Sequence, residues 1–143
     1  MKVCDLMSDH VVSVGMGEPV SAAARLLRQQ NVGSLPVCDD AGRLVGIVTD
    51  RDIVLRCVAV CGSADDMTVS DVMTHSVVTA SPFDSAGDAA RRMADAQVRR
   101  LPVCKDGELV GMLALGDLAR DSDCDMEAAD ALTEISRNIR RRR

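Results

Sequence analysis

The segment Gly46–Asp52, with the sequence GIVTDRD, places a threonine and two aspartates directly after an apolar run. Thr49 and Asp52 have the spacing of a helix capping box, in which the hydroxyl and the carboxylate each accept a backbone N–H. The same groups suit a ligand, because a helix N-terminus attracts phosphate and a carboxylate accepts hydrogen bonds from sugar hydroxyls. The motif therefore leaves both a structural cap and a ligand site open.

The composition limits the partners that the chain can have. It has 143 residues, of which 47% are hydrophobic, so a buried core is expected rather than disorder. One Phe and no Tyr or Trp disfavour stacking on nucleic-acid bases. The net charge of −5 disfavours general DNA binding, although Arg137 and Arg140–Arg143 form a basic end. We therefore expect no nucleic-acid partner.

Nothing in the sequence indicates membrane insertion or secretion. There is no run of about 18 apolar residues, and the first residues, MKVCDLMSDH, lack the long apolar stretch of a signal peptide. We expect a cytoplasmic protein with no membrane partner. Its six cysteines are then expected to be reduced thiols rather than disulfides.

The chain contains an internal repeat. When it is laid on itself so that Asp5 falls on Asp71, many residues match in order, and after a one-residue deletion Asp52 falls on Asp117. The matched segments are Val11–Val12 with Val77–Val78, Ala23–Arg25 with Ala89–Arg91, Leu35–Cys38 with Leu101–Cys104, and Leu44–Gly46 with Leu109–Gly111. Two copies of one unit therefore fill nearly the whole chain.

Each copy predicts the same order of elements. A valine-rich strand (11–14 and 77–79) comes first, and an amphipathic helix follows, for which Pro19 suits the first turn and Asp84 the N-cap. Two apolar strands then form a hairpin around an Asp/Gly turn, and a second helix begins near Asp52 or Asp117. The apolar helix stripes are Val20, Ala23, Ala24 and Leu27 in the first copy, and Ala86, Ala89, Ala90 and Met93 in the second.

The predicted fold class is α/β, with two β-α-β-β-α units and a C-terminal helix. Each sheet would have about three strands, and a unit of about 60 residues is only marginally stable alone. We therefore expect the two units to pack sheet against sheet about a pseudo-twofold axis, which would leave two related clefts.

The element order, the doubled Leu-Pro-Val and the motif G-I-V-T-x-x-D resemble the CBS domain, named for cystathionine β-synthase. The chain looks like a stand-alone bacterial tandem pair, or Bateman module. The expected domains are CBS unit 1 at 1–62, CBS unit 2 at 67–121, and a C-terminal helix with a basic tail at 122–143. The resemblance implies a regulatory module, with a role in energy sensing, that binds an adenosine-containing ligand such as AMP, ADP or ATP, and no required cofactor.

The resemblance also implies roles for the motif residues. Asp52 would hold a ribose, and Thr49 would contact phosphate. In the second copy Asp117 keeps the carboxylate, but Ala114 replaces the threonine. We therefore expect two unequal clefts, with the better-equipped motif at Asp52.

The residues before Leu-Pro-Val differ between the copies. The resemblance implies that Arg99 and Arg100 are phosphate contacts that reach into the central groove, although two arginines after a helix also suit a solvated C-terminal turn. It further implies that Val32, Gly33 and Ser34 form an adenine-side wall for the Asp117 cleft. Because no aromatic side chain is available, we expect aliphatic residues to hold the base, and these are Ile47 and Val12.

Two other functions remain open. Cys57 and Cys61 have the spacing of one helix face, which would suit a thiol or metal response, although no metal site is expected. The chain could alternatively be an interaction or assembly module in which Thr49 and Asp52 only cap a helix. No nucleophile–base order or phosphate loop is apparent, so no enzyme is expected.

The C-terminal stretch 125–143 predicts a helix with an apolar stripe of Ala128, Leu132, Ile135 and Ile139. This helix is expected to pack on the module or on a second chain, and the terminal arginines are expected to be solvated. By resemblance, we expect a homodimer that acts on an unknown effector protein.

Overall fold

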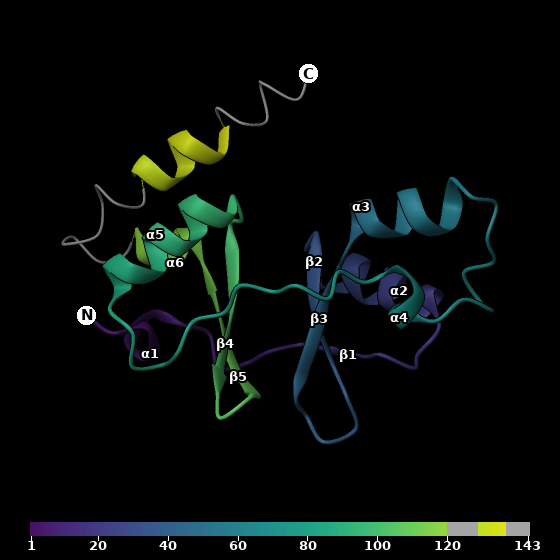
Figure 1. Ribbon diagram of the computed structural model, residues 1–143, viewed down its shortest axis with the longest axis horizontal. Helices are drawn as coiled ribbons and strands as arrows, with labels where there is room; N and C mark the ends of the chain where they lie inside the picture. Colours follow the sequence, from purple (N-terminus) through teal and green to yellow (C-terminus); the bar gives the residue numbers. More distant parts are fainter. Residues whose placement is uncertain (120–128, 137–143) are drawn as a thin grey trace. The chain divides into compact units, whose positions relative to one another are not determined.

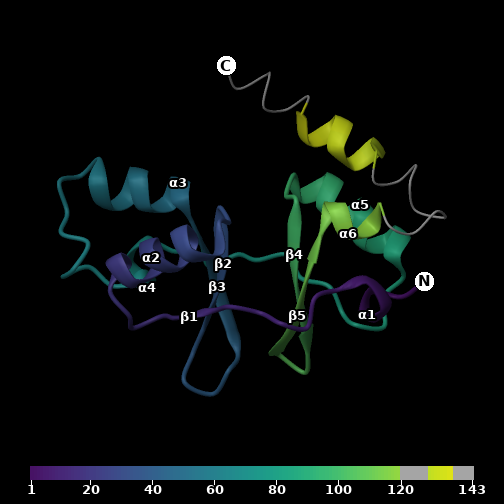
Figure 2. The same ribbon diagram turned by 180° about the vertical axis from the view of Figure 1, so that it is seen from behind.

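The computed structural model describes residues 1–119 and 129–136 of the chain (Figures 1 and 2). Its mixed α/β architecture confirms the fold class predicted from the sequence. The chain forms two compact units, one from the continuous segment Val12–Val77 and one from Met1–Val11 together with Val78–Arg143. Each unit has its own sheet, helices and core, and the expected packing about a pseudo-twofold axis stays a prediction.

The unit Val12–Val77 contains a three-stranded sheet in the order β1-β2-β3. β1 (Val14–Gly15) pairs parallel with β2 (Ser34–Cys38), and β2 pairs antiparallel with β3 (Leu44–Thr49). The predicted hairpin is therefore confirmed, whereas the predicted strand 11–14 is shorter and begins later than expected.

Four helical segments lie on one side of this sheet (Figures 1 and 2). They are α2 (Val20–Gln30), α3 (Asp50–Ile53), the π-helix η1 (Val54–Val58) that continues α3, and α4 (Val69–Val72). A π-helical turn is rare and often marks a functional segment. The predicted second helix thus exists, but its regular α-helical part ends after one turn.

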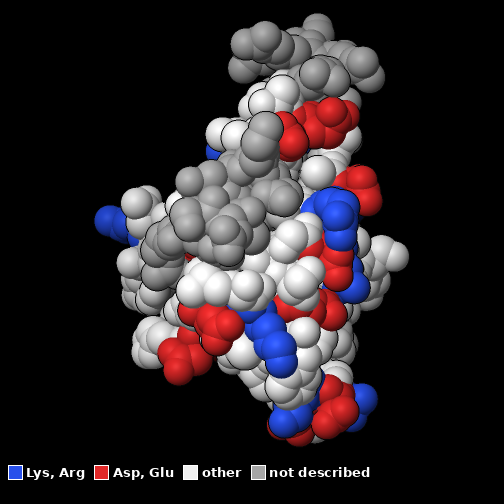
Figure 3. Space-filling view, turned by 90° about the vertical axis from the view of Figure 1, so that its left-hand side faces the viewer, with Lys and Arg blue, Asp and Glu red and all other residues white. Residues whose placement is uncertain are grey.

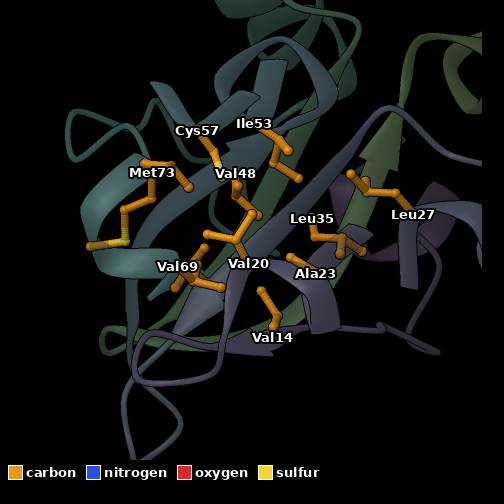
Figure 4. Packing of buried hydrophobic residues seen from close by; sticks show 12 residues of the cluster. Val14, Val20, Ala23, Leu27, Leu35, Val48, Ile53, Cys57, Val69 and Met73 are labelled. Atoms are coloured by element: carbon orange, nitrogen blue, oxygen red, sulfur yellow. The ribbon is translucent and has the colours of Figure 1, made fainter. Parts of the chain in front are cut away.

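The core of this unit consists of small aliphatic side chains, as the near absence of aromatic residues requires (Figure 4). Figure 4 shows Val20 of α2, Val48 of β3 and Val69 of α4 close together. The buried cluster comprises Val14, Val20, Ala23, Leu27, Leu35, Val37, Val48, Ile53, Cys57, Val69, Val72 and Met73. Burial of these side chains provides the main favourable contribution to folding.

The second unit is built from elements at both ends of the chain. Its helices α1, α5 and α6 lie on one side of a sheet formed by the hairpin β4–β5 (Figures 1 and 2). The elements are α1 (Val3–Leu6), α5 (Ala86–Ala96), β4 (Arg100–Lys105), β5 (Glu108–Ala114), α6 (Leu115–Leu118) and a helix at 129–136. The buried side chains of α1 thus belong to the same core cluster as those of α5, β4 and β5.

Three local predictions are wrong in the structure. Residues 77–79 form no strand, and only Ala80 makes an isolated parallel bridge, with Val103. Asp84 is not the N-cap of α5, because Ser85 takes that position and its hydroxyl accepts the Asp88 N–H. Ala24 is exposed, since it lies at the edge of the apolar stripe of α2.

A glycine in each sheet allows another part of the chain to approach closely. Gly46 of β3 lies against Met73 and Thr74, and a Cβ at Gly46 would be 2.7 Å from the Thr74 carbonyl oxygen. At the equivalent position of β5, a Cβ on Gly111 would be 2.5 Å from Met7 Sδ. The segments after α4 and α1 therefore cross their sheets at places where only glycine leaves enough room.

This crossing explains why the compact units do not follow the linear repeat. The short helix at the start of each sequence copy packs with the sheet of the other copy, so Met1–Val11 belongs with Val78–Arg143. The domain bounds 1–62, 67–121 and 122–143 describe the repeat in the sequence, and as folding domains they stay a prediction.

We predict that Gly46→Ala lowers the free energy of unfolding by about 1–3 kcal/mol, because the new methyl group overlaps backbone and Met73. Urea denaturation measures the change. The control is Gly87→Ala in α5, where no atom lies within 4 Å of the added Cβ, and which should raise stability by about 0.5–1 kcal/mol. If Gly46→Ala were as stable as the wild type, the segment at Met73 and Thr74 would be able to shift at little cost.

Candidate functional site

The motif at the end of β3 forms a complete capping box. Thr49 is the N-cap of α3, and its Oγ1 accepts the Asp52 N–H at 3.0 Å. In return, Asp52 Oδ2 accepts the Thr49 N–H at 3.0 Å. The structural role expected for this pair is therefore present, and it fixes the positions of both side chains.

Asp52 has an unusual environment for a carboxylate. It is the one charged or polar residue that is buried among those the structure describes, with 9% of its surface exposed. Its Oδ1 has only long contacts, with Thr74 Oγ1 at 3.5 Å and with Arg56 Nη1 at 3.7 Å. A carboxylate oxygen with such weak partners keeps the capacity to accept a short hydrogen bond.

The residues before Leu35 lie beside this motif within the same unit. Ser34 pairs with Thr49 across the β2–β3 hairpin, and the Gly33 carbonyl accepts the Asp50 N–H at 3.0 Å. The structure therefore places Gly33 and Ser34 next to Thr49. Their predicted role at the Asp117 motif of the other unit stays a prediction.

The two aliphatic candidates, Val12 and Ile47, are half-buried. Val12 packs against the core of its unit. Ile47 exchanges two backbone hydrogen bonds with Thr74 at 2.8 and 2.9 Å, and its side chain points away from that of buried Val48. Ile47 therefore lies on the sheet face opposite the core.

The second copy keeps only half of the capping box. Asp117 Oδ2 accepts the Ala114 N–H at 2.8 Å, but alanine has no hydroxyl to return the bond. Arg100 pairs with Ala114 across the β4–β5 hairpin, and the Arg99 carbonyl accepts the Leu115 N–H at 2.8 Å. The second unit thus places two exposed arginines next to its own carboxylate motif.

These two arginines line a pocket of about 560 Å³ within the second unit. The pocket otherwise has small apolar walls, and its lining residues are Arg99, Arg100, Ala114, Leu115, Gly116, Ala119, Ala129 and Leu132. This volume is in the range of small-molecule sites. Arginine side chains bind phosphate or carboxylate groups, so the lining suits an anionic ligand with an apolar body.

Two carboxylates elsewhere on this unit are paired with arginines. Asp84 Oδ2 accepts a hydrogen bond from Arg92 at 2.8 Å, and Asp88 pairs with Arg91. The Arg91 hydrogen bond lowers the pKa of Asp88 below its ordinary value. Figure 3 shows basic and acidic side chains interspersed on the face that it draws.

Two residues that contact Asp52, Thr74 and Arg56, were not predicted from the sequence. Arg56 Nη1 also donates to the carbonyl oxygens of Val72 at 2.9 Å and Met73 at 3.1 Å. Arg56 therefore joins Asp52 to the C-terminus of α4, where a cation is favourable. The four-residue spacing from Asp52 indicated a helical ion pair, but the contact with α4 had no signal in the sequence.

The cysteine pair does not have the predicted arrangement. Cys57 is buried in η1, whereas Cys61 is exposed and has a left-handed backbone with φ of 59°. The helix ends between them, so the expected shared face is wrong. Burial raises the pKa of Cys38, which disfavours its reactive thiolate. Within residues 1–119 and 129–136, no three His, Cys, Asp or Glu side chains cluster as metal ligands.

The C-terminal helix is confirmed at 129–136, but its predicted apolar stripe is shifted. Ala131 and Ile135 are buried, whereas Leu132 is 44% exposed and lines the pocket. Other predicted residues lie outside the described part of the chain, and these are Ala128, Ile139, Arg137 and Arg140–Arg143. In the part that the structure describes, no helix is both long and apolar enough to cross a membrane.

Comparison with known families and proteins gives consistent matches. The family model for the CBS domain matches residues 3–58 and 69–122. The CBS domain-containing protein YhcV of Bacillus subtilis is 42% identical over 134 residues, which are 94% of each chain. Hypoxic response protein 1 of Mycobacterium tuberculosis is 35% identical over 81% of each chain.

Solved structures with the same fold include ligand complexes. The structure of Hypoxic Response Protein I, with two coordinated zinc ions, has a TM-score of 0.78 and 33% identity over 84% of this chain and 98% of that one. CBSX2 in complex with AMP has a TM-score of 0.72 and 33% identity over 83% and 93%. The CBS domain pair of protein MJ0100, in complex with 5-methylthioadenosine and S-adenosyl-L-methionine, has a TM-score of 0.73 and 28% identity over 84% and 98%.

We predict that Arg56→Met lowers the free energy of unfolding by about 1–2 kcal/mol, because two carbonyl groups lose a charged donor. Water replaces part of the interaction, since the Arg56 side chain is half-exposed. Urea denaturation gives the value, and the exposed neighbour Arg51, changed to Met, should alter stability by less than about 0.5 kcal/mol. Equal effects of the two substitutions would contradict a link between α3 and α4 through Arg56.

Proposed function

The chain belongs to the CBS-domain family, and we propose that it is a regulatory module that binds an adenosine-containing ligand such as AMP, ADP or ATP. Family members are generally regulatory rather than catalytic. Two structural neighbours of about 30% identity were solved with AMP or with S-adenosylmethionine and methylthioadenosine. These complexes support the ligand class for this chain.

The observation that carries the proposal is the state of Asp52. One oxygen of this buried carboxylate forms the helix cap, and the other has only long contacts. A ribose hydroxyl that donates to Oδ1 would supply the short hydrogen bond that Oδ1 lacks. A hydrogen bond to a charged group is worth about 1.5–3 kcal/mol, which is enough to select for a sugar.

Thr49 can serve the cap and the ligand at once. Its Oγ1 accepts the Asp52 N–H, so its own O–H remains a donor that can reach a phosphate oxygen. The aliphatic side chains of Ile47 and Val12 would contact the base. As the family resemblance implies, Val32, Gly33 and Ser34 would form an adenine-side wall for the Asp117 motif. The ligand is not a required cofactor.

The second motif would bind differently. Asp117 keeps the carboxylate for a ribose, but Ala114 offers no hydroxyl. Arg99 and Arg100 would instead neutralise phosphate groups from their exposed positions beside the motif. The two motifs therefore differ in how they recognise an anion, with a hydroxyl in one and guanidinium groups in the other.

The remaining properties follow the family resemblance. We propose a cytoplasmic, non-enzymatic protein that senses energy state through the adenosine ligand and passes the signal to an effector protein. A role in nucleic-acid or membrane binding is not part of the proposal.

A second candidate function, an assembly module, is favoured by one surface. Val54, Leu55 and Val58 of α3–η1 are about half exposed or more, at 53%, 48% and 63%. Three large aliphatic side chains grouped on one helix are typical of a protein contact. We propose that a second copy of the chain covers them in a homodimer, with or without a ligand.

We predict that Asp52→Asn weakens binding of AMP about tenfold or more, because the amide oxygen can keep the cap while the ribose acceptor is lost. The melting temperature over an AMP titration measures the affinity. Without AMP, the free energy of unfolding of Asp52→Asn should fall by about 1 kcal/mol or less. The matched control is Asp71→Asn in α4, which accepts the Thr68 N–H at 2.9 Å in the same way.

The two variants separate a ligand site from a cap. If Asp52→Asn and Asp71→Asn lower the melting temperature equally, with and without AMP, Asp52 is only a cap. A screen of AMP, ADP, ATP and S-adenosylmethionine on the wild-type chain comes first, and no stabilisation by any of them would refute the proposal.

We predict that Leu55→Glu converts the homodimer to a monomer, since a charge would be buried in the apolar contact. Size-exclusion chromatography with light scattering measures the mass. The control is Met16→Glu, an exposed apolar site on the same unit at 38% exposure, which should leave the mass unchanged. A monomeric wild type would contradict the assembly function.

A further inference from the structure

We propose that the C-terminal helix at 129–136 is part of a ligand site, in which Leu132 contacts the apolar body of an anionic ligand held by Arg99 and Arg100. The inference rests on the proposed function for the ligand class, adenosine phosphates, and adds a third element to the second motif. Neither the repeat nor the paired motifs indicated this helix, because it lies outside the duplicated part of the sequence.

The pocket has chemically distinct sides. Arg99 and Arg100 supply positive charge at the start of β4. Ala114, Leu115 and Gly116 continue the lining along the junction of β5 and α6. Ala119 and the C-terminal residues Ala129 and Leu132 complete the apolar part, so the pocket without this helix would lose one of its walls.

Small side chains dominate this apolar lining. Alanine and glycine leave room for a flat group such as a purine, and the two leucines provide the larger contact surfaces. The volume of about 560 Å³ accommodates a nucleotide-sized ligand. An inorganic anion alone would leave the apolar walls unused, so a ligand with both parts fits the site better.

The helix is attached by one face and offers another to the pocket. Ala131 and Ile135 are 1% and 4% exposed, and they are four residues apart, so they share a face that packs into the unit. Leu132, at 44% exposure, lies about 100° further round the helix. Its exposed apolar surface is the part that a bound ligand would remove from water.

Ligand binding and helix docking are therefore coupled. A ligand that contacts Leu132 binds the docked form of the helix more tightly than an undocked form, so it shifts the population toward docking. The coupling also acts in the other direction. If a substitution undocks the helix in part of the molecules, the apparent affinity for the ligand falls in proportion to the fraction that stays docked.

A single tryptophan tests the contact directly, because the chain contains no Trp and no Tyr. In Leu132→Trp, saturating AMP should change the emission intensity or wavelength at the same concentrations that raise the melting temperature. Val60→Trp, at a 63% exposed position of the other unit, should show no change. Inorganic phosphate should have a weaker effect than AMP, because it lacks the apolar body.

A second pair of variants tests the role of the helix at 129–136 without adding a large side chain to the pocket. Ile135→Ala removes a buried anchor and should weaken AMP binding several-fold, up to about tenfold. Thr133→Ala, on the exposed side of the same helix, should leave affinity unchanged. The melting temperature without AMP shows that each variant is folded.

The outcomes distinguish the two proposals. In one outcome, AMP raises the melting temperature of the wild type but neither changes the emission of Leu132→Trp nor binds Ile135→Ala more weakly. That result overturns the role of the helix but leaves the proposal of adenosine binding at the Asp52 motif intact. No stabilisation of the wild type by AMP, ATP or S-adenosylmethionine overturns both. A response of Trp at position 132 together with weaker binding in Ile135→Ala supports the site.

Discussion

The hydrogen bond from a backbone N–H to a carboxylate three residues later recurs throughout both units. At the starts of α1, α3, α4 and α6 it pairs the N-cap N–H and places negative charge at the positive end of the dipole. Before α2 and α5 the same bond closes a turn that precedes the helix. The pairs, with N···O distances of 2.7–3.0 Å, are Lys2 with Asp5, Gly15 with Glu18, Thr49 with Asp52, Thr68 with Asp71, Ser81 with Asp84, and Ala114 with Asp117. They occur at equivalent positions of the repeat, so both copies of the repeated sequence form the same set of hydrogen bonds between a backbone N–H and a carboxylate.

If Asp52 binds a ligand as proposed, the same hydrogen bond links stability to recognition. At Asp52, one carboxylate oxygen holds the start of α3, and the other has only long contacts with Thr74 and Arg56. The cap fixes the position of the carboxylate before any ligand arrives, which reduces the entropy that binding must overcome. At Ala114 the cap is incomplete, and two exposed arginines lie nearby instead. The two copies of the repeat therefore carry two chemically different motifs.

The sequence was sufficient where the deciding contacts are local. The hairpins, the capping box of Thr49 and Asp52, and the stripe of α5 follow from spacing along the chain, and each is present in the structure. The predicted strand at 77–79 is wrong because a high valine content does not show whether a neighbouring strand is available for pairing. In this segment only Ala80 forms a bridge, with Val103.

Contacts between distant parts of the sequence could not be predicted in this way. Arg56 donates to carbonyl groups sixteen and seventeen residues away in the sequence. Leu132 and Arg99 line the same pocket, although no sequence motif contains them both. The packing of Met1–Val11 with the second half of the chain depends on tertiary fit at Gly111, which a repeat alignment cannot show. The ligand roles proposed for Thr49, Asp52 and Asp117 rest on resemblance and chemistry, because a cap and a binding site require the same residue types.

The crossing at Gly111 has a consequence for synthesis on the ribosome. The helix α1 is translated before the strand that it packs against, β5. The unit Val12–Val77 is continuous, so all of its residues are translated before β5. Val3 and Leu6 of α1 therefore lack the β5 part of their native core until β5 has been translated.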